Sequence, residues 1–176
     1  MKTNIVIFLL FICPFFSMGQ PKVKIGMTMD EVKKIYPNTV SASYQNTITL
    51  SRPDTLFGLD DEWGYRFEND KLNWIFFHKY IDEITKENFK KCLSAAANLM
   101  KQYADFYGLP DSVIVGDTAF VDPYVKHHWG YDVIESQWKN AEGMKISIGF
   151  TFMGGKGEYH FIVSINIFDK SYPYFN

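Results

Sequence analysis

Cysteine is scarce in this chain, which has two, Cys13 and Cys92, among 176 residues. Cys13 lies in an N-terminal stretch with the character of an export signal, so cleavage of that stretch leaves one thiol and excludes an internal disulfide. An exported domain of this kind must be stabilised by a packed core instead. Cys92 falls among apolar residues of a predicted helix, where we expect a buried structural thiol rather than a reactive one.

Long apolar runs are also absent beyond one at the start, Ile5 to Phe16. Its length of about twelve residues is short of the roughly twenty that a membrane-spanning helix needs. Lys2 precedes the run and the small residues Ser17 and Gly19 follow it, so we predict a signal peptide over 1–19 and an exported, periplasmic or extracellular protein. Leu10-Phe11-Ile12-Cys13 leaves a lipid anchor at Cys13 as an alternative.

The chain has no large excess of either charge: 18 Lys and Arg stand against 20 Asp and Glu, a formal net charge of -2. Scattered charge of this kind argues against nucleic acid or anionic lipid as the main partner, because both require a clustered basic surface. Residues 20–176 have the length of one domain with its own core.

Motifs for catalysis or metal binding are missing as well. The glycine-rich stretch 149–157 lacks the Ser or Thr that follows the lysine of a phosphate-binding loop, and no Gly-x-Ser-x-Gly turn occurs. His127 and His128 point to opposite faces if extended, His78 and His160 are isolated in sequence, and Asp60-Asp61-Glu62 lacks the ligand spacing of a calcium loop. The sequence therefore predicts no catalytic residue, no metal site and no cofactor.

Two helices are indicated by their N-terminal caps. Thr28 and Glu31 have the spacing of a capping box, and Pro37 ends this first helix. The second helix is predicted from near Thr85 to Tyr107, with a stop at Gly108. Its apolar stripe consists of Phe89, Leu93, Ala96, Met100, Tyr103 and Tyr107, which is a core-facing pattern.

Two antiparallel hairpins follow from alternating apolar and polar residues. A two-residue turn at Asn69-Asp70 predicts one register, and a turn at Gly155-Lys156 predicts the other. The predicted pairs are Phe67 with Leu72, Tyr65 with Trp74 and Trp63 with Phe76 in the first hairpin, and Phe152 with Tyr159, Phe150 with Phe161 and Ile148 with Val163 in the second.

The predicted fold class is α+β, with two helix-plus-antiparallel-hairpin units whose helices pack on one face of antiparallel sheet. A Trp-Gly-Tyr triplet at 63–65 and again at 129–131 favours a degenerate tandem repeat with halves at 22–82 and 83–170. Further short strands are expected within 46–51 and 133–138, and 108–126 is expected to be a loop.

Short motifs resemble a known family. Residues 24–32, Lys-Ile-Gly-Met-Thr-Met-Asp-Glu-Val, are similar to the Gly-Met-Thr-x-x-Glu-Val opening of BamE-type envelope lipoproteins, and 67–72 and 107–110 are similar to the Phe-x-x-x-Lys-Leu and Tyr-Gly-x-Pro motifs of the same superfamily. Tandem copies of this helix-plus-sheet unit occur in beta-lactamase inhibitory proteins. The resemblance implies such a fold and a non-catalytic binding role.

The open face of the hairpins is the candidate binding surface. In the predicted registers this face carries the apolar side chains of Ile75, Phe77, Ile162 and Phe168, with Gly64 opposite Ile75 and Gly149 opposite Ile162. The candidate binding residues are Arg66, Asn73, Ile75, Phe77, Thr151, His160 and Ile162. The alternative is that loops or the other half of the molecule cover this face.

Three functions remain open at this point. The first is an exported, non-enzymatic protein-binding or envelope-associated module that acts through a sheet surface. The second is an inhibitor of a secreted enzyme. The third is a small hydrolase with an unrecognised site, which would require a cleft where His160 or His128 meets a carboxylate.

Overall fold

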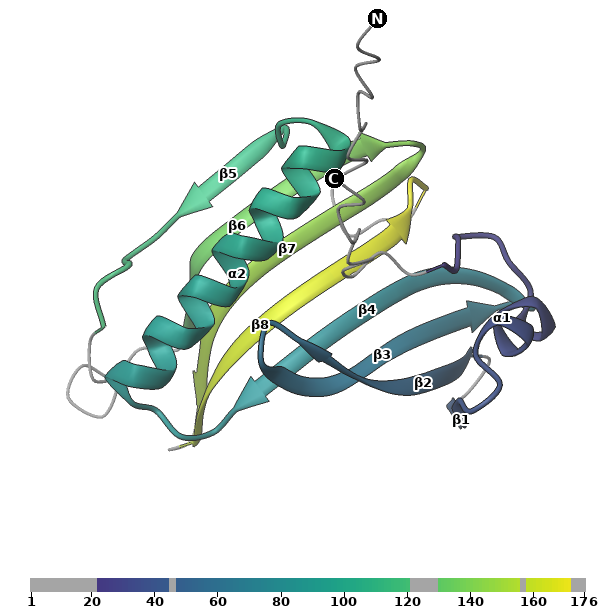
Figure 1. Cartoon of the computed structure of the whole chain (residues 1–176), viewed down its shortest axis with the longest axis horizontal. Helices are drawn as coiled ribbons and strands as arrows, with labels where there is room; N and C mark the ends of the chain where they lie inside the picture. The colour runs from purple at the N-terminus through teal and green to yellow at the C-terminus, as the bar shows by residue number, and fades with distance from the viewer. Residues whose placement is uncertain (1–21, 45–46, 121–129, 156–157, 172–176) are drawn as a thin grey trace, which may run out of the picture.

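The strands form one antiparallel sheet of eight strands, in the order β1-β2-β3-β4-β8-β7-β6-β5 (Figure 1). This computed structural model describes residues 22–44, 47–120, 130–155 and 158–171. β4 and β8 are neighbours at the centre, so the two halves of the chain meet along one hydrogen-bonded ladder. The predicted signal peptide at 1–19, the anchor at Cys13 and the residues His127 and His128 lie outside the described residues.

Along the chain, one helix followed by four strands occurs twice. The helices are α1 (Met29–Ile35) and α2 (Lys86–Tyr107). The strands are β1 (Val40–Tyr44), β2 (Thr47–Leu56), β3 (Leu59–Glu68), β4 (Lys71–Ile81), β5 (Ser112–Val115), β6 (Gly130–Ala141), β7 (Met144–Gly155) and β8 (Glu158–Asp169). No helix in the described ranges is long and apolar enough to cross a membrane.

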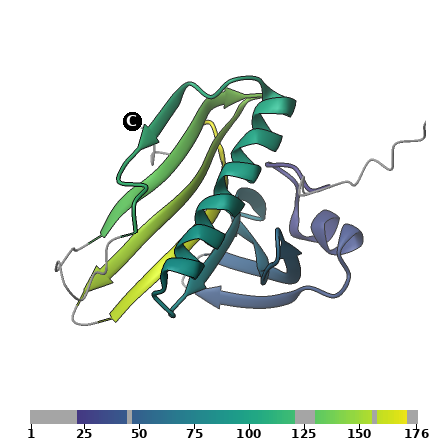
Figure 2. The ribbon, with the colours of Figure 1, turned by 60° about the vertical axis from the view of Figure 1, so that its left-hand side comes forward.

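Both predicted helix starts are confirmed. The Thr28 side chain accepts from the amide of Glu31 and the Glu31 carboxylate accepts from the amide of Thr28, which completes the capping box. The Thr85 hydroxyl accepts from the amide of Asn88, and α2 ends at Gly108, whose φ is 83°. α2 then lies across β6, β7 and β8 (Figure 2).

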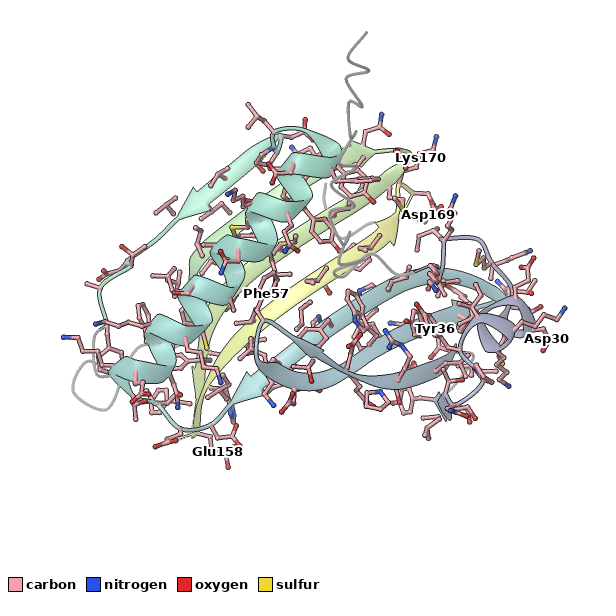
Figure 3. The ribbon with its side chains drawn as sticks, viewed as in Figure 1. Asp30, Tyr36, Phe57, Glu158, Asp169 and Lys170 are labelled. Carbon is pink, nitrogen blue, oxygen red and sulfur yellow. The ribbon has the colours of Figure 1, made fainter. Side chains whose placement is uncertain are left out.

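The N-terminal segment attaches α1 to the first half of the sheet. The Gly26 amide donates to the Leu72 carbonyl, and the Leu72 amide donates to the Met27 carbonyl. Tyr36, which follows α1 and is labelled in Figure 3, stacks on Tyr65 of β3 with ring centroids 5.8 Å apart. Through these contacts the buried Val32 of α1 joins the same core as α2.

The register of the β3–β4 hairpin differs from the prediction beyond its turn. Phe67 pairs with Leu72 as expected, yet Arg66 pairs with Trp74, so Asn73 is an extra residue on β4 and forms a β-bulge. The predicted pairs of Tyr65 with Trp74 and Trp63 with Phe76 are wrong, because the bulge turns every later side chain of β4 to the opposite face. Tyr65 pairs with Ile75, and Trp63 pairs with Phe77.

The β7–β8 register also differs, by two residues. Phe150 pairs with Val163 rather than Phe161, and Ile148 pairs with Ile165 rather than Val163. A shift of two preserves which face each side chain occupies, since the side-chain period of a strand is two. The partners predicted for this hairpin are therefore wrong, but its division into a buried and an open face is confirmed.

The α+β class with antiparallel sheet is confirmed, whereas the architecture of two helix-plus-hairpin units is wrong. All eight strands belong to a single sheet, and each half of the chain contributes four strands to it. The predictions missed β1 entirely and assigned β5 to a loop. β5 is a short edge strand, which is difficult to recognise from a four-residue pattern.

The core lies between the helices and one face of the sheet. Its largest fully buried side chains include Trp63, Tyr65, Phe77, Phe150 and Phe161. Cys92 of α2 is fully buried in this cluster, and burial raises the pKa of its thiol to about 11. The prediction of a buried structural thiol is therefore confirmed, because a protonated, inaccessible sulfur is unreactive.

Candidate functional site

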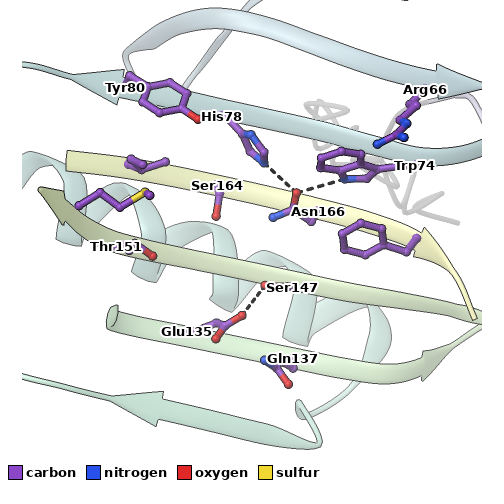
Figure 4. Close-up of a pocket in the computed structure, with 13 residues that line it drawn as sticks. Arg66, Trp74, His78, Tyr80, Glu135, Gln137, Ser147, Thr151, Ser164 and Asn166 are labelled. Atoms are coloured by element: carbon purple, nitrogen blue, oxygen red, sulfur yellow. Dashed lines mark hydrogen bonds between the residues drawn. The ribbon is translucent and has the colours of Figure 1, made fainter. Parts of the chain in front are cut away.

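The face of the sheet opposite α2 contains a pocket with a volume of about 460 Å³ (Figure 4). Side chains from five adjacent strands, β3, β4, β8, β7 and β6, line it, and α2 lies behind the sheet in this view. We call this surface the open face. In the described part of the chain, neither helix lies over it. The pocket volume is within the range of about 300–1,000 Å³ that is usual for ligand sites.

The antiparallel registers arrange the centre of the pocket in two rows. One row contains Phe76, Asn166, Ser147 and Gln137, and the next contains His78, Ser164, Gly149 and Glu135. Gly149 has no side chain of its own, but the Glu135 side chain packs beside it: a Cβ at Gly149 would lie 3.5 Å from Glu135 Cγ. A Cβ at Gly149 would lie 3.3 Å from the Ile134 carbonyl oxygen, which leaves little room for a substituent.

Asn166 of β8 is the central polar group. Its Oδ1 accepts from Trp74 Nε1 at 3.1 Å and lies 2.7 Å from His78 Nε2 (Figure 4). The indole N–H can only donate, so the oxygen of Asn166 must face Trp74, and His78 Nε2 must then carry a proton as well. The neutral imidazole therefore has its acceptor lone pair on Nδ1, and Asn166 Nδ2 retains its two donor hydrogens.

The imidazole of His78 is held neutral by its surroundings. Burial is the main cause and lowers the pKa of His78, while the hydrogen bond to Asn166 and the charge of Asp61 oppose this change. Because desolvation penalises the charged form, the pocket favours an uncharged ring at its centre near neutral pH.

Acidification is expected to destabilise the protein through His78. The pKa of a histidine in the unfolded chain is about 6.5, and the pKa in the folded state is lower, so below about pH 6.5 the unfolded state binds more protons. The free energy of unfolding should decrease as the pH falls from about 6.5 through the folded pKa. Urea unfolding at about pH 7.5 and about pH 5 measures this decrease.

His78→Gln is the matched control, because glutamine can still donate to Asn166 but does not titrate. We expect the variant to lose less stability than the wild type over this pH interval. Equal losses in both proteins would show that His78 is not the group responsible.

Aromatic rings form one end of the pocket. Trp74 stacks on Phe168 with centroids 5.4 Å apart and lies 4.6 Å from the ring of Phe76. The guanidinium carbon of Arg66 lies 5.8 Å from the centre of the Trp74 ring, which is cation–π distance. Arg66 Nε is buried and has no hydrogen-bond partner among the described residues. This end therefore combines a flat apolar surface with one positive charge.

One carboxylate, that of Glu135 on β6, lines the opposite end of the pocket, and Asp132 lies farther along the same strand. Glu135 accepts a hydrogen bond of 2.6 Å from the Ser147 hydroxyl through Oε1 (Figure 4), and Asp132 accepts one of 2.8 Å from Thr151. The pocket thus has a cationic end on β3 and an acidic end on β6, with neutral polar groups between them.

Four residues of the predicted surface, Arg66, Thr151, Ile162 and Phe168, do line the pocket. Ile162 and Phe168 are less exposed than expected, at 7% and 6%. Two other predicted binding residues are not part of the pocket lining. The side-chain amide of Asn73 donates to the Glu68 carboxylate at the bulge, and His160 Nδ1 lies 2.7 Å from the Asp82 carboxylate.

The prediction that Ile75 and Phe77 lie on the open face is wrong. Both are core residues, with exposures of 1% and 0%. The physical reason is the bulge at Asn73, which directs Trp74 and Phe76 to the open face in their place. Gly64 consequently faces Phe76, whose ring fills the space above it, and Gly149 faces Ser164 rather than Ile162.

Sequence reasoning missed Trp74, His78, Asn166 and Glu135 as site residues. His78 and Asn166 are separated by 88 positions in the chain, and they meet only because β4 pairs with β8. The polar residues His160, Ser164 and Asn166 at alternate positions of β8 were visible in the sequence, but they indicated a solvent-exposed face and not a pocket. Among the described residues, no group of three or more His, Cys, Asp or Glu side chains could hold a metal ion.

Comparison with known proteins gives little further information. No family model matches the chain, and no solved structure matches it with significance. The chain is 27% identical over 96 residues to the RNA-directed RNA polymerase L of human respiratory syncytial virus A (strain A2), and 25% identical over 96 residues to that of virus B (strain B1). Each match covers 52% of this chain but 4% of the polymerase. The chain therefore spans a small fraction of the curated relatives that it matches, and these likenesses assign it to no family.

Proposed function

We propose that this protein is an exported, non-enzymatic binding module that holds a protein partner on the open face of its sheet. The observation that carries the proposal is the pocket on that face, where Asn166 orders Trp74 and His78 while leaving its own amide donors for a ligand. Export rests on the signal-like composition of residues 1–19.

The composition of the open face supports a protein partner. Tyr80 and Met153, which belong to the pocket lining, are each 52% exposed, and large exposed apolar groups beside polar ones are typical of protein interfaces. Trp74 adds a partly buried aromatic anchor of the kind that often dominates binding energy. A partner that inserts side chains between these groups would bury them.

The geometry around His78 supports binding rather than catalysis. Ser164 is its direct partner across the β4–β8 ladder, so a serine and a histidine are neighbours here. An activated serine requires a hydrogen bond from its hydroxyl to an imidazole nitrogen, however, and among the hydrogen bonds of the described residues none joins Ser164 to His78, whose ring contacts Asn166 instead. The nearest pocket carboxylate, Glu135, is on β6, two strands beyond Ser164.

Site-specific photo-cross-linking in the producing cells tests the proposal. A benzophenone amino acid is placed at Tyr80 or Met153 on the open face, and at Phe106 of α2 as the matched control, since Phe106 is 59% exposed on the helix side. We expect the same cross-linked protein species from both open-face positions and none from Phe106. Equal cross-linking from all three positions, or none from the open face, would overturn the proposal.

A further inference from the structure

We infer that the segment held on the open face is an extended stretch of polypeptide with an acidic group at one end and a basic group at the other. This inference rests on the proposed function, because it names the chemistry of the partner at the same pocket. It follows from the two charges that flank the pocket, Arg66 and Glu135.

Arg66 and Glu135 are far apart on the sheet. The strand order places β4, β8 and β7 between β3, which carries Arg66, and β6, which carries Glu135. Four strand spacings correspond to about 19 Å between their backbones. In the described part of the chain neither residue takes part in an ion pair. The two charges therefore do not neutralise each other and remain for groups of a ligand.

Both charged side chains are held in place, and both retain hydrogen-bonding capacity. The ring of Trp74 supports the Arg66 guanidinium, whose buried Nε lacks a partner. The hydroxyl of Ser147 fixes Glu135 through Oε1, which leaves the other carboxylate oxygen to accept. A carboxylate is the natural ligand of the first end and an ammonium or guanidinium of the second.

The groups between these ends suit a peptide backbone. Asn166 Nδ2 provides donors for a carbonyl oxygen, and His78 Nδ1 provides an acceptor for an N–H group in the tautomer fixed above.

An extended peptide fits better than the main alternative, a neutral oligosaccharide. A neutral ligand that covered the pocket would desolvate Arg66 and Glu135 without pairing either charge, which is costly. A single amino acid is too short, since an extended residue spans at most about 3.6 Å. The acidic and basic groups of the occupant should therefore be separated by at least about three residues.

Selection from a displayed library of random eight-residue peptides tests the inference with the full chain. The wild type should enrich peptides that carry one acidic and one basic residue at least about three positions apart. Arg66→Glu should instead enrich peptides with two basic residues, and Glu135→Arg should enrich peptides with two acidic residues. Lys90→Glu and Asp105→Arg, at exposed positions of α2, are the matched charge controls and should enrich the wild-type pattern.

Binding measured on the selected wild-type peptide gives the size of the effect. Arg66→Gln and Glu135→Gln keep the side-chain length and remove the charge, and each should weaken binding by about tenfold or more. Thermal unfolding of every variant establishes that it is folded.

The outcomes separate the inference from the proposed function. Enriched peptides without a charge pattern, or with a pattern that neither charge variant changes, would overturn the inference and leave the binding module intact. Binding to an array of neutral oligosaccharides in place of peptides would also overturn it. Enrichment of no peptide, together with no cross-linking from Tyr80 or Met153, would overturn both.

Discussion

Replacing Phe77 by alanine is expected to lower the free energy of unfolding by about 3–5 kcal/mol. The Phe77 side chain is fully buried, and its ring lies 5.7 Å from that of Trp63 in the core. Truncation removes a large apolar group and leaves a cavity that the neighbouring strands cannot close, because β4 is held on both sides by β3 and β8.

Phe76→Ala is the matched control, because it removes the same atoms one position earlier from a ring on the open face. We expect it to cost less than half as much, since Phe76 is only partly buried. Urea unfolding of the two variants and the wild type measures both costs. A larger loss for Phe76→Ala than for Phe77→Ala would mean that β3 and β4 pair without the bulge at Asn73.

The parts of the fold that depend on local chemistry were predictable from the sequence. The helix cap at Thr28 is predicted by a hydroxyl and a carboxylate three residues apart. The turn at Asn69-Asp70 is predicted by two adjacent residues that tolerate positive φ. The cap and the turn each depend only on residues that are close together in the sequence. For that reason their positions in the structure agree with the prediction.

The bulge at Asn73 could not be predicted because β4 is apolar on both faces. Trp74 and Phe76 alternate with Ile75 and Phe77, so either set could be the buried one, and period-two reasoning has no basis for a choice. β8 does alternate, and an error of two residues in its pairing therefore left the faces correct. The predicted binding residues follow this division: those on β7 and β8 are on the open face, whereas Ile75 and Phe77 of β4 are not.

The single sheet was not predictable either, because the pairing of β4 with β8 joins segments about 90 residues apart in the chain. Each hairpin accounts for its own hydrogen bonds, and a sequence pattern does not say whether its outer edge meets solvent or another strand. The pocket depends on that pairing. Asn166 of β8 meets Trp74 and His78 of β4 only across this ladder, so the site is a product of the tertiary fold.

Gly64→Ala is expected to destabilise the protein by about 1–3 kcal/mol, which is the usual cost of overpacking. Gly64 is buried opposite Phe76, and a Cβ at this position would overlap the Cζ and Cε atoms of the Phe76 ring. The ring would have to move, which would disturb its contact with Trp74 and thereby the aromatic end of the pocket. Aromatic residues that cover a glycine on the neighbouring strand stabilise sheets in this way.

A double-mutant cycle identifies the ring of Phe76 as the cause. In the Phe76→Ala background the space above Gly64 is vacant, so adding Gly64→Ala should cost less than about 0.5 kcal/mol. The coupling between the two substitutions should then account for most of the cost of Gly64→Ala alone. If Gly64→Ala costs the same in both backgrounds, the penalty arises from the β3 backbone and not from the ring. The cycle therefore tests the register on which the open face and its pocket depend, without requiring that any ligand be known.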